Sequence, residues 1–162
     1  MDVASGLLLG ERKLQQDSVA THQHRSSGAW LLALSDGIGG AGNGHLASSL
    51  IVRAAMASLK AHVGDLASGV KAIDVLRSAA LAANRSVASA AVRFPDKAGM
   101  GGTVLLAIAT HSRLHYLSIG DSIIFHVRNG TIRRVNTLHS LAGEVDALAA
   151  TAGLDVLSQP PS

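Results

Sequence analysis

The chain has 162 residues, with 14 Lys and Arg against 11 Asp and Glu, so its formal net charge at pH 7 is +3. Hydrophobic residues make up 48% of it, which argues against intrinsic disorder and favours a single domain over residues 1–162. The chain contains no cysteine, so disulfides, thiolate metal sites and a cysteine nucleophile are excluded.

Charge and hydropathy also argue against nucleic acid and membrane as partners. The pI of 9.8 rests on an excess of only three basic residues, and only 2% of residues are aromatic, too few for a base-stacking surface. The longest stretches free of charged residues, 37–52 and 98–112, are shorter than the roughly 18 apolar residues that a membrane span needs. Nothing at the start resembles a cleaved signal, so we expect a cytoplasmic protein.

The first half of the chain alternates between apolar runs and polar turns, and then changes to a helical period. Short apolar or β-branched runs over residues 3–9, 18–23 and 29–35 predict three strands. Apolar residues recur at helical spacing over residues 44–63 and again over 70–92, which predicts two helices, the second rich in alanine.

The second half of the chain returns to short strands. Residues 94–99 break the second helix, and Asn129-Gly130 is a strong signal for a two-residue hairpin turn. The remaining predicted elements are strands over residues 103–109, 114–119, 123–128 and 131–135, and a helix over 140–152. Strands joined by short connections, with helices grouped apart from them, predict an α+β fold with antiparallel sheets.

Two carboxylates lie beside predicted strands in glycine-containing loops. Asp36 follows an apolar strand in Ser35-Asp36-Gly37-Ile38-Gly39-Gly40, where glycines let backbone carbonyls approach a hard cation. Asp121 lies in Gly120-Asp121-Ser122, between two predicted strands. Taken singly, Asp36 is better explained as a helix-entry cap, and an ordinary turn explains Asp121 just as well.

A third cluster precedes a predicted strand, in Arg12-Lys13-Leu14-Gln15-Gln16-Asp17-Ser18. Arg12 offers a bidentate fork for phosphate, and Asp17 a carboxylate that orders water on a metal, although a solvated surface pair is the better explanation when they are taken in isolation. The three aspartates together suit a hydrated Mg²⁺ or Mn²⁺ site that binds a phosphoryl group. Spacing alone leaves open whether they converge.

Four motifs follow one another along the chain, namely Arg12 to Ser18, Leu34 to Gly40, Met100 to Thr103 and Ile119 to Ser122. In this order they resemble the metal-dependent (PPM, type 2C) serine/threonine protein phosphatases in their compact bacterial form. The corresponding family elements are Arg-x-x-Asn-Glu-Asp-Ser, Ala-Asp-Gly-Met-Gly-Gly, Met-Gly-Thr-Thr and Gly-Asp-Ser-Arg. The resemblance runs over nearly the whole chain.

This resemblance implies a β-sandwich of two antiparallel sheets flanked by helices, in four layers, with a binuclear Mn²⁺ or Mg²⁺ centre at one end. Asp36 would bridge the two metals, the Gly37 carbonyl would bind one of them, and Asp17 would act through metal-bound water. Arg12 would hold the substrate phosphate, and Asp121 would help to form an additional, weaker metal site. Metal-activated water would then attack phosphoserine or phosphothreonine in phosphorylated proteins, opposing a serine/threonine kinase.

The chain departs from the family's motifs at four positions. Gln16 replaces an acidic residue beside the Asp, and Ala41 replaces the His that often follows Gly-Gly. Ile123 replaces the Arg after Gly-Asp-Ser, and Leu138 replaces the Asp that precedes His-Ser. Together these changes indicate a divergent site.

The chain also ends before the family's later strands, which carry two further metal-binding aspartates. Its carboxylates after Asp121 are Glu144, Asp146 and Asp155, and none of them lies in a matching context. We therefore expect a domain that lacks the family's C-terminal strands, with weak or absent activity from these residues alone. The alternative is a catalytically impaired pseudophosphatase, or a regulatory module that binds phosphoproteins without hydrolysing them.

Overall fold

The computed structural model describes residues 1–39, 43–68 and 70–139. The chain divides into two units, residues 1–122 and 123–162, and each is described here by itself. The helix predicted over residues 140–152 lies outside the described residues.

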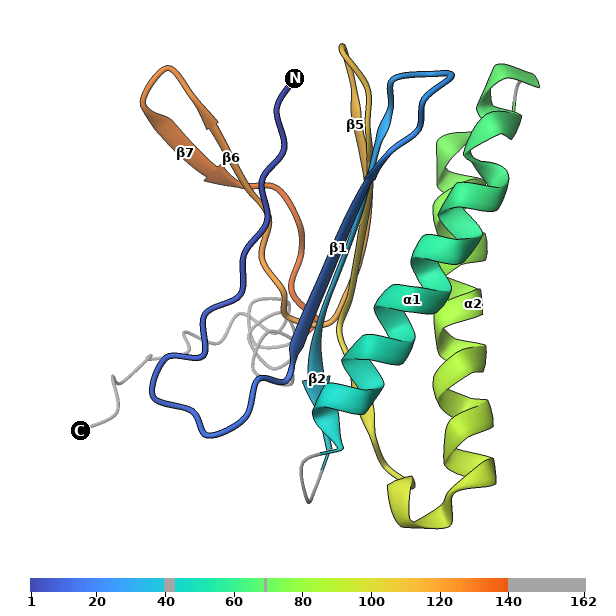
Figure 1. Ribbon diagram of the computed structural model, residues 1–162. Helices are drawn as coiled ribbons and strands as arrows, with labels where there is room; N and C mark the ends of the chain where they lie inside the picture. Colours follow the sequence, from blue (N-terminus) through green and yellow to red (C-terminus); the bar gives the residue numbers. More distant parts are fainter. Residues whose placement is uncertain (40–42, 69, 140–162) are drawn as a thin grey trace, which may run out of the picture. The chain divides into compact units, whose positions relative to one another are not determined.

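The first unit is built on a sheet of antiparallel strands (Figure 1). Its main strands lie in the order β1 (Asp17–Gln23), β2 (Trp30–Ile38), β4 (Val104–Ala109) and β5 (Leu114–Ile119). A short strand, β3 (Gly101–Gly102), pairs with the end of β2. The four main strands confirm those predicted for this unit from residue 18 onward, with small shifts at their ends.

The run over residues 3–9 does not form a strand, so that prediction was wrong. An apolar run becomes a strand only where another strand satisfies its backbone hydrogen bonds, and no strand in the described part of the chain pairs with it. Most of this segment is exposed, including Leu8 at 92% of its surface.

Two helices, α1 (Gly44–His62) and α2 (Ala72–Arg93), cover one face of the sheet (Figure 1). Short 3₁₀ turns, η2 (Val63–Ser68) and η3 (Pro95–Lys97), follow them. The core lies between helices and sheet, and its completely buried larger side chains are Leu31, Leu59, Leu76, Leu106 and Ile108. Both helix predictions are confirmed, and no helix in the described ranges is both long and apolar enough to cross a bilayer.

Strand β2 separates the core from the candidate site. Along β2 buried and half-exposed side chains alternate, so Leu31 and Ala33 enter the core. Because successive side chains of a strand point to opposite faces, Asp36 lies on the face away from the helices. Antiparallel strands with helices grouped on one side confirm the predicted α+β fold.

The described part of the second unit is a hairpin of β6 (Phe125–Arg128) and β7 (Thr131–Arg134). Its turn residues, Asn129 and Gly130, have φ values of 49° and 76°, and Asn-Gly with two positive φ angles is typical of a type I′ turn. The hairpin predicted from Asn129-Gly130 is confirmed.

Candidate metal and phosphate site

Asp17 and Asp36 are paired directly across the β1–β2 ladder. The side chains of such a pair project from the same face, with Cβ atoms about 4.5–5.5 Å apart. The sequence predicted that Asp36 follows the end of the strand, and this was wrong, because β2 continues to Ile38 and Asp36 lies inside it. The strand register therefore brings together two carboxylates that are distant in the sequence.

The pKa of Asp36 is raised above its ordinary value of 3.8. Partial burial is the largest cause, and the Asp17 carboxyl raises the pKa further through its charge and through a hydrogen bond. The Arg12 guanidinium lowers the pKa of Asp36, and the Asp121 carboxylate raises it. Asp17, Arg12 and Asp121 thus all lie within electrostatic range of the Asp36 carboxyl.

Thr103 fixes the backbone of Asp36. The Asp36 N–H donates to Thr103 Oγ1 at 2.9 Å, and the Thr103 N–H donates to the Asp36 carbonyl at 2.9 Å. The Thr103 hydroxyl also shares a hydrogen bond of 2.7 Å with Ser122, the residue after Asp121. Motif similarity marks Thr103 in the sequence but assigns it no role, and the structure shows that it links the loops of two candidate carboxylates.

Gly37 and Gly44 allow the end of β2 to lie directly against the first turn of α1. A Cβ on Gly37 would overlap the Gly44 carbonyl, and a Cβ on Gly44 would lie 2.5 Å from the Gly37 carbonyl oxygen. The Gly37 N–H donates to the Gln16 carbonyl at 3.1 Å, which ties β2 to the segment before β1. Side chains at these two positions would push the helix away from the site.

Arg12 and Asp121 are the exposed members of the site. Arg12 follows a turn in which its N–H donates to the Leu9 carbonyl at 3.3 Å. Asp121 comes after Gly120, whose φ of 101° turns the chain sharply at the end of β5. Both side chains are therefore accessible to a ligand from solvent.

The donors fit part of a site for a hard divalent cation. Carboxylate and carbonyl oxygens are the ligands that Mg²⁺ and Mn²⁺ prefer, and two neighbouring carboxylates whose charges repel favour a cation between them. Within residues 1–39, 43–68 and 70–139, however, no three His, Asp or Glu side chains converge closely enough to hold an ion. Ala41 and the later carboxylates Glu144, Asp146 and Asp155 lie outside the described residues.

Comparison with known proteins agrees with the motifs. Residues 9–154 match the family model for protein phosphatase 2C. The serine/threonine protein phosphatase PstP of Mycobacterium tuberculosis is 35% identical over 109 residues, which cover 67% of this chain and 20% of PstP. The serine/threonine phosphatase stp of Listeria welshimeri is 27% identical over 130 residues, covering 80% of this chain and 51% of stp.

Solved structures define the class of fold. The catalytic domain of PstP, in complex with two manganese ions, aligns at a TM-score of 0.69 and 30% identity, over 92% of this chain and 60% of that domain. A bacterial serine phosphatase at 19% identity gives a TM-score of 0.73 and shares the fold. The architecture is that of the PPM-type phosphatase domains, as the motifs predicted. The chain belongs to the protein phosphatase 2C family.

The match covers only part of these relatives. The chain spans one fifth of the length of PstP and about half the length of stp. It also spans 60% of the manganese-bound catalytic domain.

Proposed function

We propose that this chain acts as a metal-dependent protein phosphatase on phosphoserine and phosphothreonine. The observation that carries the proposal is the cross-strand pair of Asp17 and Asp36, with Arg12 close enough to lower the pKa of Asp36. Two carboxylates beside a guanidinium offer a place for a cation next to a place for a phosphate.

Each residue has a distinct part in this proposal. Asp36 and the Gly37 carbonyl would hold Mn²⁺ or Mg²⁺, Asp17 would act on it through water, and Asp121 would contribute to a weaker metal site. A divalent cation supplies Lewis acidity, which lowers the pKa of water and offsets phosphate charge. Arg12 holds the phosphate in a bidentate fork and orients it toward the carboxylates.

The substrates in this proposal are proteins phosphorylated by a serine/threonine kinase in the cytoplasm. Two relatives, PstP and stp, carry the name serine/threonine phosphatase, which supports this class of substrate. The chain's single-domain organisation over residues 1–162 stays a prediction.

A second candidate is a pseudophosphatase that binds phosphoproteins without hydrolysing them. Gln16 removes one carboxylate beside Asp17, and the described residues contain no convergent group of three ligands, which favours this alternative. In this case Arg12 would still bind phosphate, but the metal would be held weakly or not at all.

The decisive experiment measures Mn²⁺-dependent hydrolysis of an aryl phosphate and of a phosphothreonine peptide, with Asp36→Asn as the control. Hydrolysis that requires Mn²⁺ and disappears in the Asp36→Asn variant would establish the phosphatase. Calorimetric titration with Mn²⁺ separates the two candidates further. Phosphopeptide binding without hydrolysis and without Mn²⁺ binding would establish the pseudophosphatase instead.

A further inference from the structure

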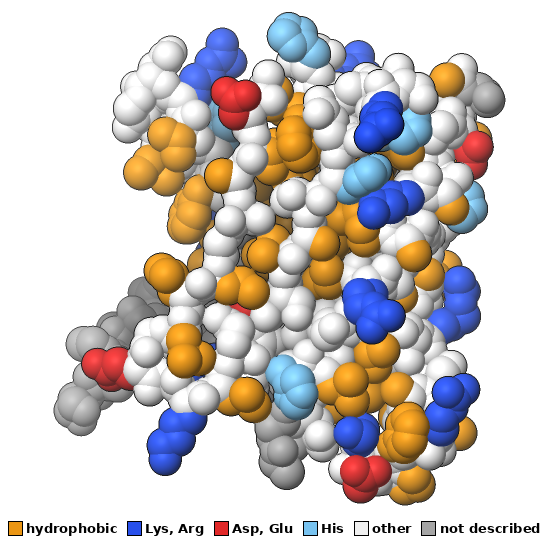
Figure 2. All heavy atoms as spheres, viewed as in Figure 1, with side chains coloured by type: hydrophobic (Ala, Val, Ile, Leu, Met, Phe, Trp, Pro, Cys, Tyr) orange, Lys and Arg blue, Asp and Glu red, His pale blue; other side chains and the backbone are white. Residues whose placement is uncertain are grey.

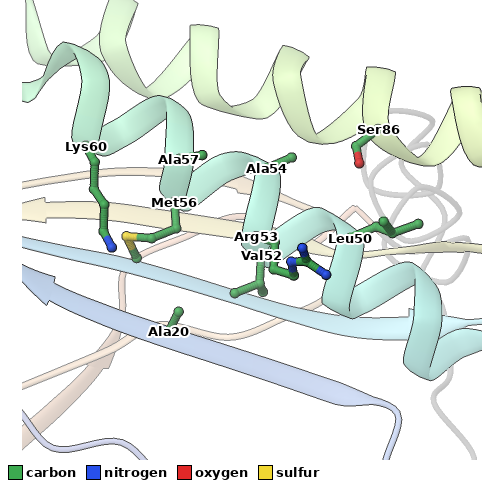
Figure 3. Close-up of a pocket in the computed structure, with 9 residues that line it drawn as sticks. All are labelled: Ala20, Leu50, Val52, Arg53, Ala54, Met56, Ala57, Lys60 and Ser86. Carbon is green, nitrogen blue, oxygen red and sulfur yellow. The ribbon is translucent and has the colours of Figure 1, made fainter.

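A groove of about 610 Å³ lies along α1 in the first unit, bounded by Ala20 of β1 on one side and by Ser86 of α2 on the other (Figure 3). Its floor is apolar and includes Val52 and Met56 of α1 and Ala20 of β1. Arg53 and Lys60 extend from α1 toward the strand on either side of Met56 (Figure 3). The groove is thus an apolar channel with a cation near each end.

The groove is strongly biased toward positive charge. Helix α1 carries Arg53 and Lys60 but no Asp or Glu along its 19 residues. Both side chains are exposed, and neither forms an ion pair with any residue in the described part of the chain. Figure 2 shows Lys, Arg and His side chains with apolar surface between them on the face where α1 lies.

His22, near the end of β1, lies close enough to Lys60 to be affected by its positive charge. Its pKa is lowered, first by loss of solvent around the ring and then by the positive charge of Lys60, with smaller effects of His24 and Arg25. Lys60, His24 and Arg25 therefore lie close enough to act on His22, and no carboxylate is among the causes of this shift.

Strand β1 forms one wall of the groove and is an edge strand of the described sheet. It pairs with β2 on one side, and no described strand pairs with its other side. The outer edge of such a strand presents backbone N–H and C=O groups that another extended segment can bind.

We propose that this groove binds an extended, acidic segment of a partner protein, which adds to the free edge of β1 and places carboxylates against Arg53 and Lys60. The observations that carry the proposal are the uncovered strand edge, the apolar floor and the excess of positive charge. This binding is independent of the proposed phosphatase reaction.

The distance between Arg53 and Lys60 along α1 is compatible with contacts to side chains on one face of a bound extended segment. Arg53 and Lys60 lie two helical turns apart, which is about 10 Å along the helix axis. In an extended segment, side chains on one face repeat every second residue, about 6.6–6.8 Å apart. Alternating glutamates therefore place a carboxylate within reach of each flexible cationic side chain, while the backbone lies along β1.

The test is a fluorescence anisotropy titration of the 162-residue chain with a labelled decapeptide of alternating Glu and Thr. We expect saturable binding that weakens as salt rises from about 50 to about 300 mM, because the contacts with exposed cations are screened. A decapeptide of alternating Lys and Thr serves as the charge control and is expected not to bind. Equal binding of both peptides, or no binding of the acidic peptide, would overturn the proposal.

Variants locate the binding surface. The double substitution Arg53→Glu and Lys60→Glu is expected to weaken binding about tenfold, since two attractive contacts become repulsive. The matched control, Arg77→Glu with Arg85→Glu, makes the same charge change at exposed positions of α2 and is expected to bind normally. Circular dichroism verifies that both variants are folded, and equal effects of the two would contradict the assigned surface.

Backbone-modified peptides test strand addition directly. Two acidic peptides, N-methylated at alternate residues in opposite phase, each lose the N–H donors on one edge. We expect one phase to abolish binding and the other to preserve it, whereas equal binding of both would exclude addition to β1. The Asp36→Asn variant is expected to bind the acidic peptide normally, which separates this surface from the phosphatase site. Tighter binding of single-stranded DNA than of the peptide would overturn the assignment of an acidic protein segment as the partner.

Discussion

Asp36 and Thr103 hold each other through two hydrogen bonds that run in opposite directions. The Asp36 N–H donates to the Thr103 hydroxyl, and the Thr103 N–H donates to the Asp36 carbonyl, each at 2.9 Å. The same hydroxyl reaches Ser122 beside Asp121 at 2.7 Å. One small polar side chain therefore connects β2, the start of β4 and the loop after β5.

Replacing Thr103 with Val is expected to destabilise the chain by about 1–2 kcal/mol, because the part-buried Asp36 N–H loses its acceptor while the side-chain shape is kept. Urea denaturation followed by circular dichroism measures the change. Thr103→Ser retains the hydroxyl and serves as the control, with an expected loss smaller than that of Val. Equal losses for the two variants would show that packing, and not the hydrogen bond, is important at this position.

Gly44→Ala is expected to cost about 1–3 kcal/mol, because its Cβ would lie 2.5 Å from the Gly37 carbonyl oxygen and force α1 away from β2. Gly64→Ala is the matched control, since nothing lies within 4 Å of a Cβ there. Its effect is expected to stay within about 0.5 kcal/mol. Thermal unfolding of both variants measures the difference, and a neutral Gly44→Ala would show that the helix start can move without cost.

Asp36→Asn is expected to stabilise the metal-free chain at neutral pH. A carboxyl whose pKa is higher in the folded than in the unfolded state binds more protons when folded, so its contribution to stability falls as pH rises through that interval. The gain in Tm, measured in a chelator at pH 7, should vanish below the ordinary Asp pKa of 3.8, where both states are protonated.

The exposed Asp2→Asn is the control for this experiment, and it is expected to leave Tm unchanged at every pH. Added Mn²⁺ should raise the Tm of the parent chain and leave that of Asp36→Asn unchanged, because a ligand stabilises only a state that binds it. A gain in Tm that persists at low pH would have a cause other than the charge of Asp36.

Arg12→Ala is expected to reduce kcat/KM for an aryl phosphate by about 10–100-fold, which corresponds to the loss of a charge-assisted contact of about 1.5–3 kcal/mol. Inhibition by inorganic phosphate should weaken in parallel. Arg113→Ala, at an exposed position in the turn between β4 and β5, should leave both unchanged. A full loss of kcat with unaltered phosphate inhibition would assign Arg12 a role other than binding phosphate.

Local patterns in the sequence predicted most of the described elements. Helical spacing in α1 and α2 and the Asn129-Gly130 turn depend on neighbours in the sequence, which is why their positions were predicted closely. The strand predicted over residues 3–9 was wrong because strand formation depends on a distant partner strand as well as on local composition.

The candidate site was predicted residue by residue but not as an arrangement. Motif similarity selected Asp17 and Asp36, yet their pairing depends on the β1–β2 register, which composition does not encode. The role of Thr103 and the contact between Gly37 and Gly44 likewise involve segments far apart in the chain. Such relationships require the tertiary structure.

The alternation along β2 also has a consequence for folding fidelity. Ser35 and Asp36 are adjacent but lie on opposite faces of the sheet, with Leu31 and Ala33 on the core side. A slip of one residue in pairing would drive the Asp36 carboxylate into the apolar layer under α1 and expel the leucine, at a large energetic cost. The alternation along β2 therefore disfavours a shifted register, because only the native one keeps Leu31 and Ala33 in the core. The same register places Asp36 opposite Asp17, so burial of the core and formation of the acidic pair depend on each other.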